Sequence, residues 1–408
     1  MSDIRNAITQ SYREEWARVV ASLTRRFGDL DIAEEAAAEA FAIAVERWPA
    51  DGVPPNPGAW LTTTANRKAI DRIRREHKRG DKQKEALMLS AHDPPEPLGA
   101  IDDDRLRLIF TCCHPALAIE ARVALTLRMV GGLTVPEIAR AFLVKEATIG
   151  QRITRAKAKI AAARIPYRMP SAEDLPARVS GVLAVLYLVF NEGYLATGPE
   201  TDPIRHDLTT EAIRLTRLIH ALMPEDGEVT GLLALMLLTD ARRTARVAAS
   251  GELVSLDEQD RGAWDAELIA EGHRLVRERL AAREAPGRYQ ILAAINAVHT
   301  SARDIRDTDW SQVVALYDQL VRLDPSPIVA LNRAIAVAEI DGPDVALAAV
   351  DRLQDRLAGY HAFHATRADL LRRLGRSHEA RAAYDRAIEL AGNTGETAYL
   401  SRRRAQLR

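Results

Sequence analysis

The run from Leu133 to Lys157 restricts the fold of this chain more tightly than any other segment. Thr134 can cap a helix, and Glu137 stands three residues later, at the reciprocal position of a capping box. Pro136 falls in the first turn, where its missing N–H is harmless. A second helix follows after a short turn. The segment therefore predicts a helix-turn-helix.

The second helix of this pair has a polar face suited to DNA. Ile138 and Ala139 would anchor the first helix, and Ile149 and Ile153 the second. Arg and Gln side chains can read base edges in a major groove, whereas Lys and Thr suit phosphates. The candidate DNA-reading residues are Thr148, Gln151, Arg152, Arg155, Lys157 and Lys159. An ordinary amphipathic hairpin with a solvated basic face is the alternative. Leu143 occupies the turn where glycine is common, and a left-handed conformation there would cost roughly 1 kcal/mol.

Helical periodicity also dominates the rest of the 408 residues, and alternating β-branched runs with hairpin turns are missing. We therefore predict an all-α fold with several domains. The predicted parts are two small helical domains at 1–80 and 102–165, a linker at 81–101, and a larger helical extension at 171–408.

Charge is distributed unevenly along the chain, although the formal net charge is -1. The segment Arg67–Lys82 holds eight basic and three acidic residues, and Lys145–Arg164 holds six basic residues and one Glu. In Asp29–Asp51 the sign reverses, with seven acidic residues and one Arg. Two basic segments and one acidic segment predict two contacts with polyanions and one with a separate basic partner.

The acidic segment predicts a helix from Asp31 to Trp48, with Asp31 as its N-cap. The apolar side chains available for its inner face are Ile32, Ala36, Ala40, Ile43 and Val45. Residues 51–58 contain Gly and Pro and cannot continue this helix.

A basic helix is expected to begin near Ala59. Its inner stripe would be Leu61, Ala65, Ala69 and Ile73. The polar and basic residues that project elsewhere are Asn66, Arg67, Arg72, Arg74 and Arg75. Such groups can follow a phosphate backbone, and a nearby aromatic residue such as Trp60 can stack on an unpaired base. In isolation, however, a basic helix is more often simply solvated.

The C-terminal part, at about 310–395, shows a repeat with spacings of 33 and 34 residues. Its columns are Val313, Ala346 and Ala380; Tyr317, Val350 and Tyr384; and Leu320, Leu353 and Ala387. This is the period of tetratricopeptide helix pairs, in which small residues permit close packing. Unrelated helix hairpins are the alternative.

The order of acidic helix, Trp60–Arg75 helix, linker and terminal helix-turn-helix resembles the extracytoplasmic-function branch of the sigma-70 family, over residues 1 to 165. The run Leu186–Tyr194 and the C-terminal repeats resemble the subgroup that carries a tetratricopeptide-like extension. The resemblance implies a transcription initiation factor whose partners are promoter DNA and core RNA polymerase, through its β′ clamp helices and β flap.

The same resemblance implies roles for individual residues. The polymerase-contacting residues would be Asp31, Glu35, Glu39 and Phe41. The −10 element would be melted and read by Trp60, Asn66, Arg67, Arg72, Arg74 and Arg75. The helix Glu146–Lys159 would read the −35 element, and the linker would pass through the RNA exit channel. The extension would regulate the factor or bind a small soluble regulatory protein.

Other signals carry no specific chemistry. Cys112-Cys113-His114 favours packing over a metal site, with redox sensing as an alternative. Polar clusters at 191–194, 240–243 and 260–265 could line a ligand groove, but we interpret them as interhelical ion pairs and caps. No phosphate loop, zinc spacing or nucleophile motif appears, so we expect no enzyme activity, cofactor or metal.

Cellular location is predicted from the cysteines and the apolar runs. Two adjacent cysteines suit a reducing cytoplasm, and the N-terminus lacks a signal layout. The apolar run Val182–Phe190 is too short to span a bilayer. We therefore expect a cytoplasmic protein with no membrane contact. Two competing functions are a stand-alone helix-turn-helix regulator with a ligand- or protein-sensing helical domain, and an interaction scaffold built on the repeats.

Overall fold

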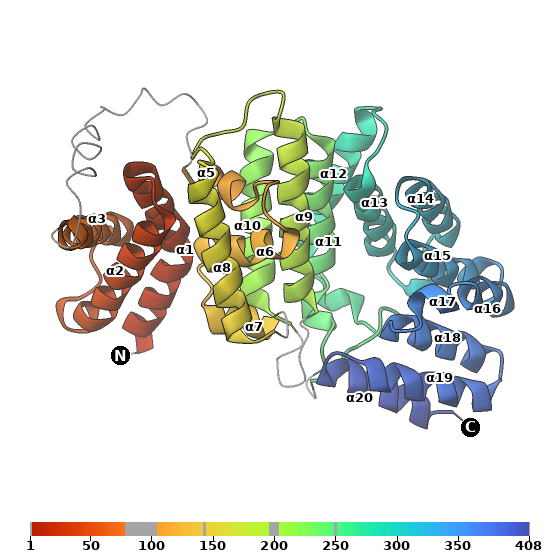
Figure 1. Ribbon diagram of the computed structural model, residues 1–408. Coiled ribbons are helices and arrows are strands. Elements are labelled where there is room, and N and C mark those ends of the chain that lie inside the picture. The colour runs from red at the N-terminus through yellow and green to blue at the C-terminus, as the bar shows by residue number, and fades with distance from the viewer. Residues whose placement is uncertain (1, 78–103, 142–143, 196–203, 249–250, 408) are drawn as a thin grey trace. The chain divides into compact units, whose positions relative to one another are not determined.

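The computed structural model describes residues 2–77, 104–141, 144–195, 204–248 and 251–407. These residues fold into two compact units, 1–188 and 189–408 (Figure 1). Within the described ranges there is no β-sheet, since the single isolated bridge pairs Val247 with Leu253. The all-α prediction is confirmed. The predicted linker at 81–101 and the turn residue Leu143 lie outside the described residues.

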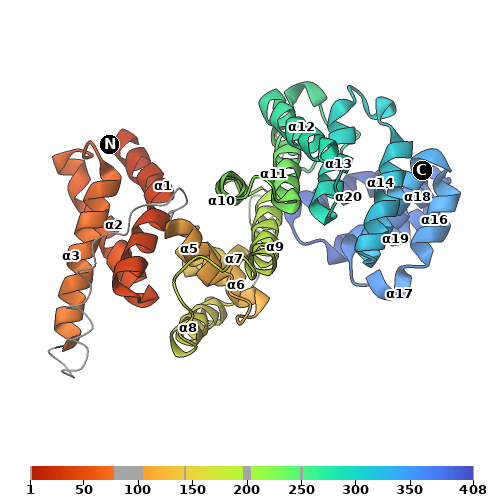
Figure 2. The ribbon, with the colours of Figure 1, turned by 90° about the horizontal axis from the view of Figure 1, so that it is seen from above.

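The first unit opens with a bundle of three helices, seen side by side in Figure 2. They are α1 (Ser2–Phe27), α2 (Leu30–Asp51) and α3 (Pro57–His77). The predicted stripe on α3 is confirmed, because all four of its side chains are buried: Leu61, Ala65, Ala69 and Ile73. This burial places the basic side chains of α3 on its remaining faces.

The start of α2 corrects two predictions. Asp29 is the N-cap rather than Asp31, and its carboxylate accepts hydrogen bonds from the backbone N–H groups of Asp31 (2.8 Å) and Ile32 (3.0 Å). The predicted inner face was also partly wrong, since Val45 is 55% exposed. The buried residues of α2 are Leu30, Ala33, Ala36, Ala37, Ala40, Phe41, Ala44 and Trp48.

Four shorter helices follow in the described part of the first unit. They are α5 (Asp104–Cys112), α6 (Ile119–Met129), α7 (Val135–Ala141) and α8 (Glu146–Ala162). The predicted capping box is confirmed: the Glu137 carboxylate accepts a hydrogen bond from the Thr134 backbone N–H at 2.7 Å, and the Thr134 hydroxyl accepts one from the Glu137 N–H at 3.4 Å. The four predicted anchors of α7 and α8 are all buried: Ile138, Ala139, Ile149 and Ile153.

The two cysteines are buried and free, which confirms the packing prediction. The Cys113 Sγ atom lies 3.4 Å from the hydroxyl of Thr126. Burial raises the pKa of the Cys113 thiol to about 11 and that of Cys112 well above its ordinary value. Among the described residues no group of three or more His, Cys, Asp or Glu side chains is placed to hold a metal ion.

Helix α9 (Leu175–Tyr194) is the one described helix long and apolar enough to cross a membrane by length and composition. Its apolar side chains are largely buried in the protein, as in a core helix: Val179, Val182, Leu183, Val185, Leu186, Val189 and Phe190. At its N-terminal half, Arg178 donates a hydrogen bond to the carbonyl oxygen of Phe110 in α5 at 2.5 Å.

In the described part of the second unit, all regular secondary structure is helical apart from the isolated bridge. Its first helices are α10 (His206–Leu222), α11 (Gly227–Asp240), α12 (Ala266–Ala281) and α13 (Arg288–Ser301). Helix α11 is the core of this group, because every residue from Val229 to Asp240 is buried. It packs against α10, α12 and α13.

The C-terminal helices of this unit pack consecutively, as Figure 1 shows in blue. They are α14 (Trp310–Leu323), α15 (Pro327–Ile340), α16 (Pro343–Asp351), α17 (Gln354–Leu357), α18 (His361–Arg373), α19 (Ser377–Leu390) and α20 (Thr394–Ala405). Each column of the predicted repeat has one residue in α14, one in or just after α16, and one in α19, at corresponding positions. The first column is fully buried: Val313, Ala346 and Ala380. The tetratricopeptide assignment itself stays a prediction.

Candidate nucleic-acid interface

Helix α8 presents three of its six predicted DNA-reading residues fully to solvent. Gln151, Arg155 and Lys159 are exposed, and Thr148 is half-buried. Arg152 is half-buried and lines a hollow of about 220 Å³ whose other lining residues are Ile119, Glu120, Val123, Ala124, Ile149 and Leu188. The long cationic and amide side chains of this face can reach base edges or phosphates without any change in the helix.

Lys157 is the exception on this helix. Its side chain is 7% exposed, and its Nζ atom lies 2.8 Å from Oδ1 of Asp31 and also donates a hydrogen bond to Glu34. Glu34 is 13% exposed and also accepts a hydrogen bond from Nε of Arg128 at 2.5 Å. In this conformation Lys157 therefore joins α8 to the acidic helix α2 instead of facing DNA.

Helix α3 carries a second basic surface. Arg67, Arg74 and Arg75 are exposed. Asn66 is half-buried; its amide donates to the Thr62 carbonyl oxygen at 3.0 Å, and its own oxygen accepts from Arg26. These contacts orient Asn66 at the surface of the bundle, next to the exposed arginines.

Trp60 lies at the N-terminal end of α3, where its ring meets that of Trp48 edge-on, with centroids 5.5 Å apart. Trp60 is half-buried, whereas Trp48 is 2% exposed. The buried ring thus supports an aromatic side chain that is partly open to solvent, and such a side chain can stack on a base.

Acidic side chains of α2 form ion pairs with Lys and Arg side chains of neighbouring helices. Glu35 forms an ion pair with Arg72, and the carboxylate of Glu39 lies 3.4 Å from Nζ of Lys68. Asp31 pairs with Lys157 but is still 63% exposed. Because both partners are partly exposed in the pairs of Glu35 and Glu39, these two ion pairs are weak and can exchange for those of another basic surface.

Phe41 is placed differently from the three acids. It is 5% exposed, and its ring meets that of Tyr12 edge-on at 4.8 Å between centroids. In this conformation Phe41 supports α2 from inside the bundle and offers almost no surface to a partner.

A second set of contacts, which the sequence analysis missed, joins α1 to the helix-turn-helix region. The Tyr12 hydroxyl donates a hydrogen bond to the backbone carbonyl oxygen of Gly132 at 2.7 Å. The Nε1 atom of Trp16 donates one to the backbone carbonyl oxygen of Arg128 at 3.2 Å. Gly132 has φ +71°, and a Cβ there would lie 3.0 Å from the Trp16 ring. Tyr12 and Trp16, four residues apart on one face of α1, were the available signal.

Comparison with known proteins follows the same division of the chain. Residues 11–79 match the family model for sigma-70 region 2, residues 107–160 match sigma-70 region 4, and residues 178–280 match a family of unknown function, DUF6596. No solved structure matches the chain.

Among whole proteins, an uncharacterised protein of Rhizobium meliloti is 46% identical over 94% of this chain and 92% of its own length. The ECF RNA polymerase sigma factor SigK of Mycolicibacterium vanbaalenii is 30% identical over 36% of this chain and 76% of its own. SigK of Mycobacterium tuberculosis strain H37Rv is also 30% identical, over 36% of this chain and 80% of its own. The chain therefore belongs to the extracytoplasmic-function family of sigma-70 factors, which are not enzymes but direct transcription initiation by RNA polymerase at promoter DNA.

Proposed function

We propose that this sigma factor divides promoter recognition between the exposed faces of α3 and α8 and docks on polymerase through α2. The observation that carries this proposal is the arrangement of charge in the first unit. Arg67, Arg74 and Arg75 of α3 and Gln151, Arg155 and Lys159 of α8 are exposed, while the acids of α2 lie on a different helix, where Glu35 and Glu39 pair with Arg72 and Lys68 of α3. Separate basic surfaces suit two DNA elements, and an acidic surface suits a basic protein.

In this proposal, α3 melts and reads the −10 element through Trp60, Asn66, Arg67, Arg72, Arg74 and Arg75. Helix α8 reads the −35 element through Thr148, Gln151, Arg152, Arg155, Lys157 and Lys159. Asp31, Glu35 and Glu39 contact the β′ clamp helices, with Phe41 supporting them from inside the bundle, and the β flap is a further contact. Lys157 becomes available to DNA once its ion pairs with α2 have opened.

We further propose domain limits of 1–80, 81–101 and 102–165 for the sigma part and 171–408 for the extension. The extension controls the factor, by itself or with a small soluble regulatory protein, through tetratricopeptide-like repeats at about 310–395. The support is the burial of the first repeat column, Val313, Ala346 and Ala380, and the division of the chain into two compact units. A factor that works on chromosomal DNA acts in the cytoplasm, which is the location we propose.

A run-off transcription assay with core RNA polymerase tests the proposal. Full-length protein should confer initiation at a promoter that core polymerase alone does not use. The triple variant Arg67→Ala, Arg74→Ala, Arg75→Ala should lose open-complex formation but keep polymerase binding. If full-length protein binds duplex promoter DNA tightly without polymerase and never supports initiation, it is a stand-alone regulator and the proposal is wrong.

Truncation after about residue 170 tests the role of the extension in the same assay. Promoter activity that differs between full-length and truncated protein supports a regulatory extension, provided that circular dichroism shows the truncated protein to be folded. Equal activity of the two folded proteins would contradict it.

A further inference from the structure

The sequence analysis interpreted the polar clusters at 240–243 and 260–265 as ion pairs and caps. Three arginines of the second unit lie in these clusters or close to them in the sequence: Arg242, Arg246 and Arg261. That interpretation holds for part of these segments: Arg243 pairs with Asp240 at 3.0 Å, and Asp265 caps α12. It does not hold for Arg242, Arg246 and Arg261. Among the described residues, none of these three half-buried arginines forms an ion pair with a carboxylate.

Each of these arginines also has a buried nitrogen without a hydrogen-bond partner in the described structure. Arg242 donates to the side-chain oxygen of Asn296 at 3.0 Å, but its Nε has no partner. Arg261 donates to the carbonyl oxygens of His299 (2.6 Å) and Ala302 (2.8 Å), but its Nη2 has none. A buried guanidinium nitrogen left in this way is costly unless a ligand or an ordered water satisfies it.

Arg246 is held in place by an aromatic ring. Its guanidinium carbon lies 3.4 Å from the centroid of the Tyr194 ring, and its Nη1 is buried without a partner. Burial and the neighbouring Arg242 lower the pKa of Arg246, while Glu396 acts in the opposite direction. The group nevertheless stays charged at physiological pH, because the pKa of arginine starts above 12.

A cavity of about 230 Å³ opens beside Arg246. Its polar lining is Ser255, His361, Glu396 and Tyr399, and its apolar lining is Leu195, Leu253, Val254, Ala362, Ala365 and Leu400. The one carboxylate at this cavity, Glu396, is already engaged, since its Oε1 lies 3.1 Å from Nε2 of His361. Arg246 is therefore the charge at this cavity that is left without a direct partner.

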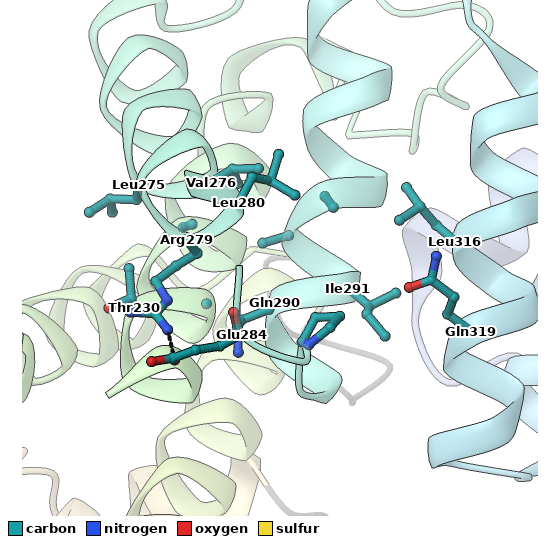
Figure 3. A pocket seen from close by; sticks show the side chains of 15 residues that line it. Thr230, Leu275, Val276, Arg279, Leu280, Glu284, Gln290, Ile291, Leu316 and Gln319 are labelled. Atoms are coloured by element: carbon teal, nitrogen blue, oxygen red, sulfur yellow. Dashed lines mark hydrogen bonds and ion pairs between the residues drawn. The ribbon is translucent and has the colours of Figure 1, made fainter. Parts of the chain in front are cut away.

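A second cavity in the same unit makes a useful contrast (Figure 3). It has a volume of about 170 Å³ and is lined by Leu275, Val276, Leu280 and Ile291 among others. Its arginine, Arg279, forms an ion pair with Glu284, drawn as a dashed line in Figure 3. That cavity has no uncompensated charge to attract an anion.

We propose that the cavity beside Arg246 binds a small organic anion, with a carboxylate or phosphate group on the Arg246 guanidinium and an apolar body against Leu253, Ala365 and Leu400. The size agrees with this class, because an apolar cavity of about 150 Å³ is enough for benzene. Arg242, a neighbour of Arg246, adds positive potential there, and charge-assisted hydrogen bonds to an anion are stronger than neutral ones.

The test is isothermal titration calorimetry of the full-length protein with three probes: benzoate, its uncharged isostere benzamide, and phenyl phosphate. Saturable binding of benzoate or phenyl phosphate is expected, with benzamide weaker by about ten-fold or more. Which of the two anions binds more tightly identifies the headgroup. If neither anion binds saturably, or if benzamide binds as tightly as the anions, the proposal is wrong.

Two variants locate the site. Arg246→Gln removes the charge, and Ala365→Leu fills the cavity while keeping every charge; each should weaken anion binding by about ten-fold or more. Arg306→Gln is the matched control, because Arg306 is an exposed arginine whose ion pair with Asp304 lies at the surface. Unchanged binding in Ala365→Leu overturns the proposal even if Arg246→Gln does not fold. The assay measures binding alone, so its outcome is separate from promoter activity.

Discussion

The Nζ atom of Lys157 lies 2.8 Å from Oδ1 of Asp31, although the two residues are 126 positions apart. One belongs to the helix proposed to read the −35 element and the other to the helix proposed to dock on polymerase. The two surfaces that should contact different partners thus contact each other in the isolated chain.

Replacing Lys157 with methionine tests how much this contact contributes to stability. Lys157→Met should lower the free energy of unfolding of the first unit by about 1–2 kcal/mol, measured by urea denaturation. The loss of stability should be smaller than for a fully buried ion pair. In the variant Glu34 keeps its ion pair with Arg128, and Asp31 is largely exposed. Arg155→Met, at an exposed position of α8, is the control and should change stability by less than about 0.5 kcal/mol. Equal stability of the two variants would contradict the role of Lys157.

Charge reversal on α2 tests the polymerase-docking surface. The double variant Glu35→Lys, Glu39→Lys should weaken binding to core polymerase, because it places positive charge against a basic surface. It should cost little stability, since the pairs of Glu35 with Arg72 and Glu39 with Lys68 are partly exposed. Pull-down of core polymerase measures the affinity and circular dichroism the fold. Glu46→Lys, exposed nearer the C-terminal end of α2, is the control. Unchanged core affinity in the double variant would remove this assignment.

Substitutions on α8 separate base reading from phosphate contact. In holoenzyme binding to promoter DNA, Gln151→Ala should cost about 1–3 kcal/mol and relax specificity at one base pair. Lys159→Ala should instead weaken binding to all sequences alike and reduce the salt slope by about 1. Fluorescence anisotropy over a range of salt concentrations, with single-base variants of the −35 element, distinguishes the two. Gln151→Ala with an unaltered base preference would show that this residue does not read a base.

His299 predicts a pH dependence of stability in the second unit. Burial, together with Arg242 and Arg261, lowers the pKa of His299 to about 4, from 6.5. The unfolded chain therefore binds more protons between these values, so the contribution of neutral His299 is full above about pH 6.5 and is lost as pH falls towards about 4. The loss is on the order of 2–3 kcal/mol.

The variant His299→Gln isolates this effect. Its unfolding free energy should fall less between about pH 7 and about pH 4.5 than that of the unaltered protein. The glutamine keeps the backbone carbonyl to which Arg261 donates, so that hydrogen bond is preserved. Parallel pH profiles for the two proteins would show that His299 is not the titrating group.

Local chemistry made part of this fold predictable. The capping box of Thr134 and Glu137 and the buried stripe of α3 depend on residues three or four positions apart, and both are confirmed. The start of α2 was harder, because Asp29 and Asp31 are chemically identical caps. The inner face was a separate misassignment, because Val45 is turned by about 100° from the buried Ala44 and so faces solvent.

Apart from the Asp29 cap, the contacts that were not predicted are long-range. Nothing near Lys157 in the sequence distinguishes it from Lys159, yet one is buried against α2 and the other is exposed. The grouping of Arg242, Arg246 and Arg261 was not predicted either. Each of these arginines has acidic residues close by in the sequence, but in the fold those acids pair with other residues or lie apart from the arginine. Charge patterning identified the surfaces but could not say which charges meet.

The ion pair between Lys157 and Asp31 has a thermodynamic consequence for promoter search. If polymerase binds Asp31 and the promoter binds Lys157, each partner breaks the same internal contact, and the second to arrive no longer bears that cost. By linkage, polymerase then raises the affinity of the factor for the −35 element by the same ratio as DNA raises its affinity for polymerase. We expect the free chain to ignore promoters not because it lacks a reading helix, but because assembly is cooperative.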